Sequence, residues 1–157
     1  MTDVVVSLNL PMIYAKAQRE EKDFYEVLDV YLQMIRRIHC RTYEYLGRMR
    51  ASINPLGFCY GGFYGGHLGL NDYIKPCLES ATASFGITAL NELQELYNQK
   101  SLVEDGEFAL EVLKYIENKA NEYKAEDGHL YAMYGKKVAV VKPTNPAKGC
   151  ELLKIAC

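Results

Sequence analysis

The sequence predicts an α/β protein whose strands pair mainly in parallel. Three observations lead to this fold class. Strand-like and helix-like segments alternate along the 157 residues, in the order strand, helix, strand, helix, helix, strand. The strand-like runs are short and apolar, as in strands that are buried on both faces. The first helix-like segment is long enough to serve as the crossover between two parallel strands.

The first strand is predicted over residues 4–11, VVVSLNLP, where apolar residues run almost without interruption. Pro11 has no N–H group to donate, so the strand is expected to end there. A long amphipathic helix is predicted over about residues 20–50. Its apolar positions recur at steps of three and four residues: Phe24, Leu28, Tyr31, Ile35, Ile38 and Thr42, widened by Val27, Met34, Tyr45 and Met49.

The second half of the chain supplies the remaining elements. A short helix interrupted by Pro76 is predicted over 71–80, and a buried strand over 81–85. Helices follow over 87–98 and about 106–124, the second with Asp105 as its N-cap. Residues 129–135 and 136–143 are predicted as two strands or as one bent ribbon, and the tail after them has weak helical character.

Composition excludes several classes of function. The formal net charge of -2 gives no electrostatic basis for binding nucleic acid or an anionic membrane. No apolar stretch is long enough to span a bilayer, and the N-terminus lacks the basic region of a signal peptide. The five cysteines are odd in number and none is paired as C-x-x-C, so a reducing cytoplasm is expected, without a disulfide framework or zinc site.

The stretch NPLGFCYGGFYGGHLGLND, residues 54–72, is the most unusual part of the sequence. It is not a dinucleotide fingerprint, because a helix rather than a strand precedes it, and it lacks the G-K-[ST] of a P-loop. Two interpretations remain: a tight loop with aromatic plugs, or a loop that lines a substrate cavity. Cys59 and His67 are a weak signal for a nucleophile and base, since a buried cysteine is more often a small apolar residue.

Asn9 is the strongest candidate for a ligand contact. A polar amide in an apolar strand is costly unless it is hydrogen-bonded. It either bonds a neighbouring loop or points into a pocket at the end of the strand, where α/β enzymes bind ligands. Asn91 and Glu92 raise a similar choice at the start of a helix, where Glu92 could simply favour the helix dipole. The three scattered histidines give no metal site.

Three segments extend these inferences: VVVSLNLPMIYAKAQ, NPLGFCYGGFYGG and SATASFGITALNELQELYNQKSLVEDG. In this order and spacing they resemble the large subunit of anaerobic (class III, glycyl-radical) ribonucleoside-triphosphate reductase, and HLYAMYG resembles a late strand of that family. The resemblance runs from about Val4 to Gly135. It implies a partial barrel, a slice of the family's ten-stranded α/β barrel with long crossover helices, over residues 1–135, and a divergent tail over 136–157.

The resemblance also implies what this chain lacks. In the family, a finger-loop cysteine becomes a thiyl radical, a C-terminal glycine stores the radical, and four cysteines bind zinc. The cysteine is expected upstream of residues 4–11 and the glycine beyond residue 135, where the sequence departs from the family. We therefore assign no radical role to Cys59 and no zinc site to Cys150 and Cys157, so the chain has no catalytic residue and no cofactor site of its own.

One residue carries over from the family. Asn9 matches a strand asparagine that faces the substrate, and is the predicted substrate-binding residue, whereas Asn91 and Glu92 match an Asn-Glu pair to which we give no role. The implied function is that of a reductase fragment, inactive alone. The parent enzyme acts on ribonucleotides and is activated by a radical-SAM activase. The alternatives are a half-barrel that binds itself, the missing reductase segments or an intact reductase, and a degenerate reading-frame product.

Overall fold

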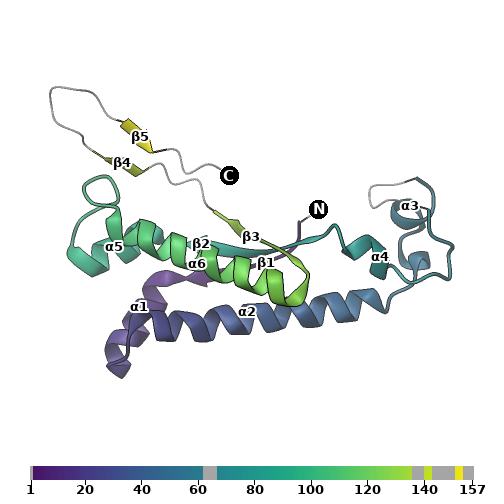
Figure 1. Ribbon diagram of the computed structural model, residues 1–157, viewed down its shortest axis with the longest axis horizontal. Coiled ribbons are helices and arrows are strands. Elements are labelled where there is room, and N and C mark those ends of the chain that lie inside the picture. The colour runs from purple at the N-terminus through teal and green to yellow at the C-terminus, as the bar shows by residue number, and fades with distance from the viewer. Residues whose placement is uncertain (1, 62–66, 136–139, 143–150, 154–157) are drawn as a thin grey trace.

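A three-stranded parallel sheet organises the protein. The computed structural model describes residues 2–61, 67–135, 140–142 and 151–153. The sheet contains β1 (Thr2–Asn9), β2 (Thr82–Thr88) and β3 (Leu130–Tyr134), and its strand order is β1-β2-β3. Long helices run beside it (Figure 1). The prediction of an α/β protein with parallel strands is therefore confirmed, including the strands near 81–85 and 129–135.

The chain turns from strand to helix at Asn9. Helix α1 (Leu10–Glu20) begins at the next residue, and the Asn9 Oδ1 accepts a hydrogen bond from the Met12 N–H at 3.3 Å. Pro11 lies in the first turn of α1, where its missing N–H group costs nothing. The prediction of a strand as far as Pro11 is therefore wrong, because this proline begins a helix instead of closing a strand.

The long helix predicted over about residues 20–50 is confirmed as α2 (Phe24–Gly47), whereas α1 before it was not predicted. Helix α1 ends at Glu21, which adopts a left-handed conformation with φ of 51°. Helix α2 (Phe24–Gly47) then begins with Asp23 as its N-cap, whose carboxylate accepts hydrogen bonds from the N–H groups of Tyr25 and Glu26. The sequence EEKD between them lacks the glycine or proline that would have marked this break.

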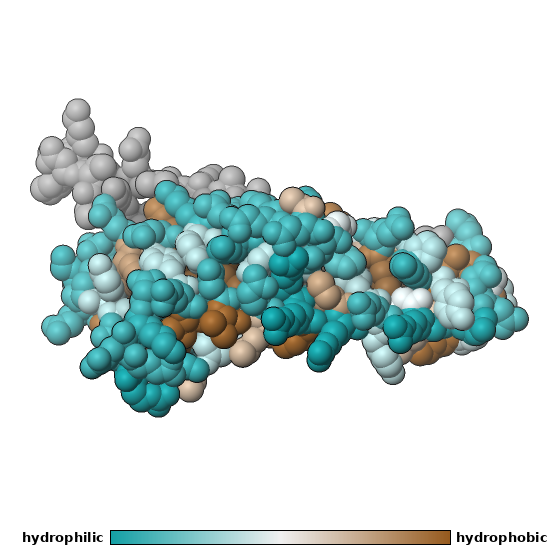
Figure 2. All heavy atoms as spheres, turned by 60° about the horizontal axis from the view of Figure 1, so that its bottom comes forward, coloured by the Kyte–Doolittle hydropathy of each residue, from teal (hydrophilic) through white to brown (hydrophobic). Residues whose placement is uncertain are grey.

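Helix α2 carries two apolar stripes. The inner stripe faces the core and consists of Phe24, Val27, Leu28, Leu32 and Ile35. The outer stripe consists of Val30, Met34 and Ile38, which are 53%, 50% and 45% exposed. Met34, Ile38 and Tyr45 belong to the single apolar stripe predicted for this helix, but the structure leaves all three exposed. Figure 2, which turns the lower side of Figure 1 forward, shows apolar patches between the hydrophilic side chains.

A small unit stands at the end of α2 that is remote from α1 (Figure 1). It contains the 3-10 helix η1 (Ala51–Ile53) and the short helices α3 (Pro55–Phe58) and α4 (Lys75–Leu78). Four side chains form its own core: Ala51, Phe58, Ile74 and Leu78. Pro76 lies in the first turn of α4, so it begins the helix that it was predicted to interrupt.

Helices α5 (Leu90–Asn98) and α6 (Glu107–Asp127) join β2 to β3. The N-cap of α6 is Gly106, not the predicted Asp105. The Asp105 carboxylate still accepts a hydrogen bond from the Glu107 N–H at 3.2 Å, and the buried Gln94 accepts one from the Ala109 N–H at 2.9 Å. One side chain of the preceding loop and one of α5 therefore satisfy two N–H groups in the first turn of α6.

A second, antiparallel pair of strands lies in the C-terminal region. It consists of β4 (Val140–Lys142) and β5 (Glu151–Leu153). Strand β4 confirms the described part of the strand predicted over 136–143. Strand β5 contradicts the weak helical character expected for the tail, and the rest of that tail lies outside the described residues.

Only one face of the parallel sheet contributes to the main core. Leu8, Ala83, Phe85, Ile87 and Tyr131 point into this core together with the inner faces of the helices. The strand order explains the asymmetry, because right-handed crossovers that advance in one direction place their helices on the same face. The opposite face carries mostly small or polar side chains: Val5, Ser7 and Asn9 on β1, Ser84, Gly86 and Thr88 on β2, and Ala132 and Tyr134 on β3.

Candidate functional site

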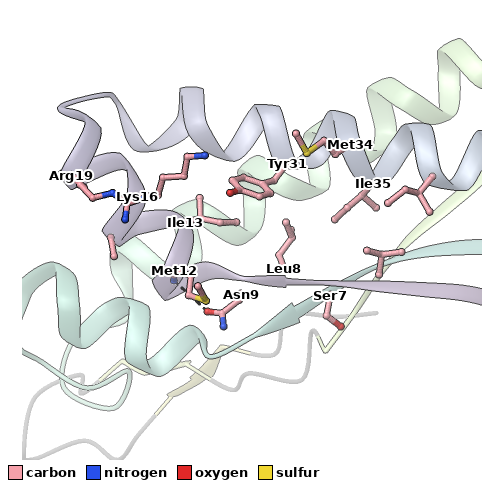
Figure 3. A pocket seen from close by; sticks show the side chains of 13 residues that line it. Ser7, Leu8, Asn9, Met12, Ile13, Lys16, Arg19, Tyr31, Met34 and Ile35 are labelled. Atoms are coloured by element: carbon pink, nitrogen blue, oxygen red, sulfur yellow. Dashed lines mark hydrogen bonds between the residues drawn. The ribbon is translucent and has the colours of Figure 1, made fainter.

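Asn9 lies at the carboxyl end of β1, on the face of the sheet that the helices leave uncovered. Figure 3 shows Leu8 pointing toward the helices, while Ser7 and Asn9 point to the opposite side. Asn9 pairs in register with Thr88, the last residue of β2. The carboxyl ends of two parallel strands therefore meet here, which is where open α/β sheets bind ligands.

One of the two polar atoms of the Asn9 amide makes a hydrogen bond within the fold. Its Oδ1 caps α1 through the Met12 N–H, at the long distance of 3.3 Å. Its Nδ2 has no hydrogen-bond partner among the described residues, and the side chain is exposed. The Oδ1 of Asn9 therefore bonds the first turn of its own α1 rather than a neighbouring loop, and its role as a ligand contact stays a prediction.

Strands β1 and β2 approach closely beside Asn9, at Ser7 and Gly86. A Cβ atom on Gly86 would stand 3.0 Å from the Ser7 Cα, so only glycine fits there. Thr88 directs its hydroxyl to the Leu8 carbonyl at 2.8 Å instead of into the open space. Ser7, Gly86 and Thr88 were not singled out from the sequence, although the alternation of side chains along a strand places Ser7 on the same face as Asn9.

A groove of about 610 Å³ runs along the outer edge of β1. Its lining is mostly apolar and comes from β1, α1 and α2, and includes Val6, Leu8, Met12, Met34 and Ile38. Lys16 and Arg19 stand at the α1 side, and Asn9 and Ser7 also contribute (Figure 3). Among the residues that the structure describes, no acidic side chain lines it. The groove thus combines an amide donor, two cations and an apolar wall, a set that can bind a small anion with hydroxyl groups.

A second polar cluster joins α2 to the end of α6. Arg36 donates to the Asp127 carboxylate through Nε at 2.8 Å and through Nη2, and the Tyr131 hydroxyl donates to the same carboxylate at 2.8 Å. The Cys40 Sγ lies 3.7 Å from that carboxylate. The hydrogen bonds from Arg36 hold the pKa of Asp127 below its usual range, and burial raises the pKa of Tyr131. Because every member is paired, this cluster is structural.

His39 is a fully buried histidine between two aromatic rings. Its ring centroid is 5.6 Å from that of Phe85 and 6.1 Å from that of Tyr131. Neither ring nitrogen has a hydrogen-bond partner of good geometry in the described part of the chain. Burial lowers the pKa of His39, and a backbone interaction with Ser84 opposes that shift only in part. His39 is therefore a neutral core residue rather than a proton carrier.

The glycine-rich stretch forms part of the small unit at the end of α2. The Asn54 side chain caps α3 through the Gly57 N–H at 3.1 Å, and Phe58 fills the small core. Cys59 packs partly against that core, as expected for a cysteine that acts as an apolar residue, and His67 is exposed. The prediction that aromatic side chains of this stretch fill a core is thus confirmed for Phe58. Residues 62–66 lie outside the described residues.

The other singled-out residues have local roles. Asn91 accepts a hydrogen bond from the Leu102 N–H at 3.0 Å and donates to Glu95 at 2.7 Å, which fixes the loop after α5. Glu92 is exposed in the first turn of α5. Within the described ranges, Cys40, Cys59 and Cys77 are free, and no group of histidine, cysteine and carboxylate side chains could hold a metal. The described residues therefore do not fit the zinc that the family resemblance implies.

Fold and site together define an α/β protein with an open parallel sheet and polar side chains where its strands end. Residues 3–136 match the family described as anaerobic ribonucleoside-triphosphate reductase. Because this match covers most of the 157 residues, the chain belongs to that family, and the resemblance seen in the sequence is confirmed. A search of individually curated proteins gave no match. None of the described helices combines the length and apolar character needed to cross a membrane.

Proposed function

We propose that this chain is a segment of the barrel wall of an anaerobic ribonucleoside-triphosphate reductase, and that its uncovered sheet face borders the ribonucleotide. The reaction served is the reduction of ribonucleotides to deoxyribonucleotides. One observation carries the proposal: all helices that pack on the parallel sheet do so on one face, and Asn9 stands on the other face at the carboxyl end of β1.

The arrangement of the sheet supports a barrel wall. In a doubly wound protein the strand order reverses and helices cover both faces. Here the order β1-β2-β3 never reverses. A parallel sheet with all its helices outside is the arrangement of an α/β barrel, and in the reductase family the interior of the barrel holds the loop with the thiyl cysteine. On the uncovered face, Ser7 and Asn9 of β1 are exposed and carry the polar groups that a substrate would meet.

Asn9 would position the substrate. Its Oδ1 is held by the Met12 N–H, which fixes the rotamer, and its Nδ2 is free to donate to a ribose hydroxyl or a phosphate oxygen. A fixed donor orients the ribose without taking part in bond breaking. In the family, the radical chemistry is supplied by a thiyl cysteine and a glycyl radical, and the described residues provide neither the metal site nor a catalytic set.

The chain by itself should therefore bind but not reduce a ribonucleotide. We expect no deoxynucleotide when the purified chain is incubated anaerobically with a radical-SAM activase, a reductant and ribonucleoside triphosphates. Turnover under these conditions would disprove the proposal.

A chimera tests the position of Asn9. Residues 3–136 would replace the matching segment of an active family reductase. Asn9→Asp keeps an acceptor for the α1 cap but replaces the free donor with a carboxylate, so kcat/KM should fall roughly 10- to 100-fold, as for the loss of a ligand hydrogen bond. Asn9→Ser, which keeps the cap and a donor, is the matched control and should lose less. Equal activity of Asn9→Asp and the parent chimera would exclude a substrate contact.

A further inference from the structure

The Thr88 hydroxyl joins the end of β2 to the end of β1. Thr88 is the last residue of β2 and pairs in register with Asn9. Its Oγ1 donates a hydrogen bond to the Leu8 carbonyl at 2.8 Å. We propose that Thr88 is a positioning residue, which holds the end of β1 so that the Asn9 amide keeps its place beside the substrate. This inference rests on the proposed function, because it deepens the role that Asn9 has there.

The bond from Thr88 acts on the peptide group directly before Asn9. The Leu8 carbonyl and the Asn9 nitrogen belong to one planar unit, so fixing the carbonyl also fixes the direction in which Asn9 leaves the strand. The Leu8 side chain is buried in the main core and points toward the helices (Figure 3). Core packing and the Thr88 hydroxyl therefore restrain the residue before Asn9 in two different directions.

The Thr88 hydroxyl has a nearer alternative that it does not use. Helix α5 begins two residues later, and its N-cap, Ala89, makes no side-chain hydrogen bond. Threonine hydroxyls at the start of a helix commonly accept hydrogen bonds from N–H groups of the first turn. Thr88 instead bonds a residue 80 positions earlier in the chain. Its hydroxyl thus serves the joint between the two strands rather than the helix that follows.

The turn that presents Thr88 is fixed on both sides. Ala89 adopts the left-handed conformation, with φ of 60° and ψ of 42°, which is strained for a residue with a Cβ atom. Strain of this kind persists only where the surrounding structure imposes it, and it clusters at functional sites. Leu90, the next residue, is buried in the main core. A short, restrained turn therefore holds Thr88 in place opposite Leu8.

The close approach of the strands just before this point limits what the loss of the hydroxyl can do. Gly86 lies two residues before Thr88, and a Cβ there would stand 3.0 Å from the Ser7 Cα. This contact does not involve the Thr88 side chain, so the spacing of β1 and β2 at Ser7 is set independently. Removal of the hydroxyl should therefore loosen the end of β1 without separating the strands.

Hydrogen exchange of the full chain tests the Thr88–Leu8 bond directly. The Met12 N–H bonds the Asn9 Oδ1, so its protection from exchange reports whether Asn9 keeps its place. Thr88→Val removes the hydroxyl and keeps the branched shape. We expect exchange of the Met12 N–H to become roughly 3- to 10-fold faster relative to the Leu28 N–H in α2, as for the loss of one hydrogen bond. Thr88→Ser, which keeps the hydroxyl, should restore most of the protection.

Thr42 provides a matched control. Its hydroxyl donates to the Ile38 carbonyl at the same distance of 2.8 Å, within α2. Thr42→Val removes the same kind of bond elsewhere, so the relative exchange of the Met12 N–H should not change. Urea denaturation of both variants separates a general loss of stability from a local effect. Equal exchange of the Met12 N–H in Thr88→Val and Thr42→Val would overturn the inference.

The chimera that carries residues 3–136 tests the consequence for the substrate. Displacement of an orienting group weakens transition-state binding, so Thr88→Val should lower kcat/KM by roughly 3- to 10-fold, and Thr88→Ser should recover most of it. Because Thr88 acts through Asn9, its substitution should have little further effect in combination with Asn9→Asp. A loss of the same size in both backgrounds would show that Thr88 acts independently of Asn9 and would overturn the inference.

The inference and the proposed function can fail separately. A chimera whose kcat/KM is unchanged by Asn9→Asp counts against the proposed function, and faster exchange of the Met12 N–H in Thr88→Val would then still support the restraint on Asn9. A chimera that loses activity with Asn9→Asp but does not respond to Thr88→Val supports the proposed function and overturns the inference alone.

Discussion

Arg36 and Asp127, which are 91 residues apart in sequence, form a two-point ion pair that ties the middle of α2 to the end of α6. Their side chains are only 20% and 14% exposed. The pair also fixes the position of β3, because the same carboxylate accepts the hydrogen bond from Tyr131. This contact connects α2, which lies between β1 and β2 in the chain, to the strand that ends the parallel sheet.

Removal of Arg36 should destabilise the fold. Arg36→Ala leaves the Asp127 carboxylate half-buried without its cation, so the free energy of unfolding should fall by about 2 kcal/mol. Urea denaturation measures this. Lys100→Ala removes the cation of an exposed ion pair with Asp105, and should lower the free energy of unfolding by about 0.5 kcal/mol or less. Equal effects of the two substitutions would contradict the prediction.

The same pair gives a prediction for acid. Hydrogen bonding to Arg36 lowers the pKa of Asp127 in the fold, so the unfolded state takes up the proton first as the pH falls. The stabilisation is complete above the unfolded pKa and is lost as the pH falls through the lowered one. Urea denaturation at about pH 2 to 5 covers the usual range of carboxyl pKa values. Over this range, the free energy of unfolding of Asp127→Asn should therefore depend less on pH than that of the parent chain.

His39 should make stability depend on pH near neutrality. Burial lowers its pKa in the fold below the usual 6.5, so between the two values the unfolded state binds more protons. Stability is full above the unfolded pKa and falls as the pH drops below it, by up to about 1.4 kcal/mol per pH unit. His39→Leu should remove this dependence of the free energy of unfolding on pH. Unfolding curves at about pH 4.5 to 7.5, on either side of the usual histidine pKa, measure it. His129→Leu, at a partly exposed position, is the control.

Gly86 should tolerate no side chain. A Cβ would stand 3.0 Å from the Ser7 Cα and closer still to the Ser7 side chain, so Gly86→Ala must push β1 from β2. Overpacking of this kind costs about 1–3 kcal/mol. Ser7→Gly removes part of the obstruction and should recover part of the loss in a double-mutant cycle. Independent, additive effects would show that the two residues do not meet.

Asn9 should contribute to stability through its cap. Asn9→Ala removes the acceptor of the Met12 N–H and should lower the free energy of unfolding by about 1 kcal/mol. Asn9→Asp should keep most of that stability. A thermal melt compares the two, and a loss for Asn9→Asp as large as that for Asn9→Ala would show that Oδ1 does not cap α1.

Local sequence determined the elements themselves. Apolar runs gave the strands near 81–85 and 129–135, and the periodicity of three and four residues gave the later helices. The order of these elements was enough to predict a parallel α/β sheet, since long crossovers join parallel strands. The quoted segments were enough to reveal the family. Each of these sequence patterns depends on residues that are close together in the chain, or on the order of the segments along it.

Only the tertiary structure decided which apolar face is covered. Met34 and Ile38 belong to the same amphipathic pattern as Ile35, and the sequence gives no means to rank them, because burial depends on where the neighbouring elements pack. Helix α1 and the role of Pro11 in starting it also went unpredicted, since a proline closes a strand or begins a helix according to the turn before it. The state of the Asn9 amide follows from the same turn. Its Oδ1 accepts the Met12 N–H, and its Nδ2 has no hydrogen-bond partner among the described residues.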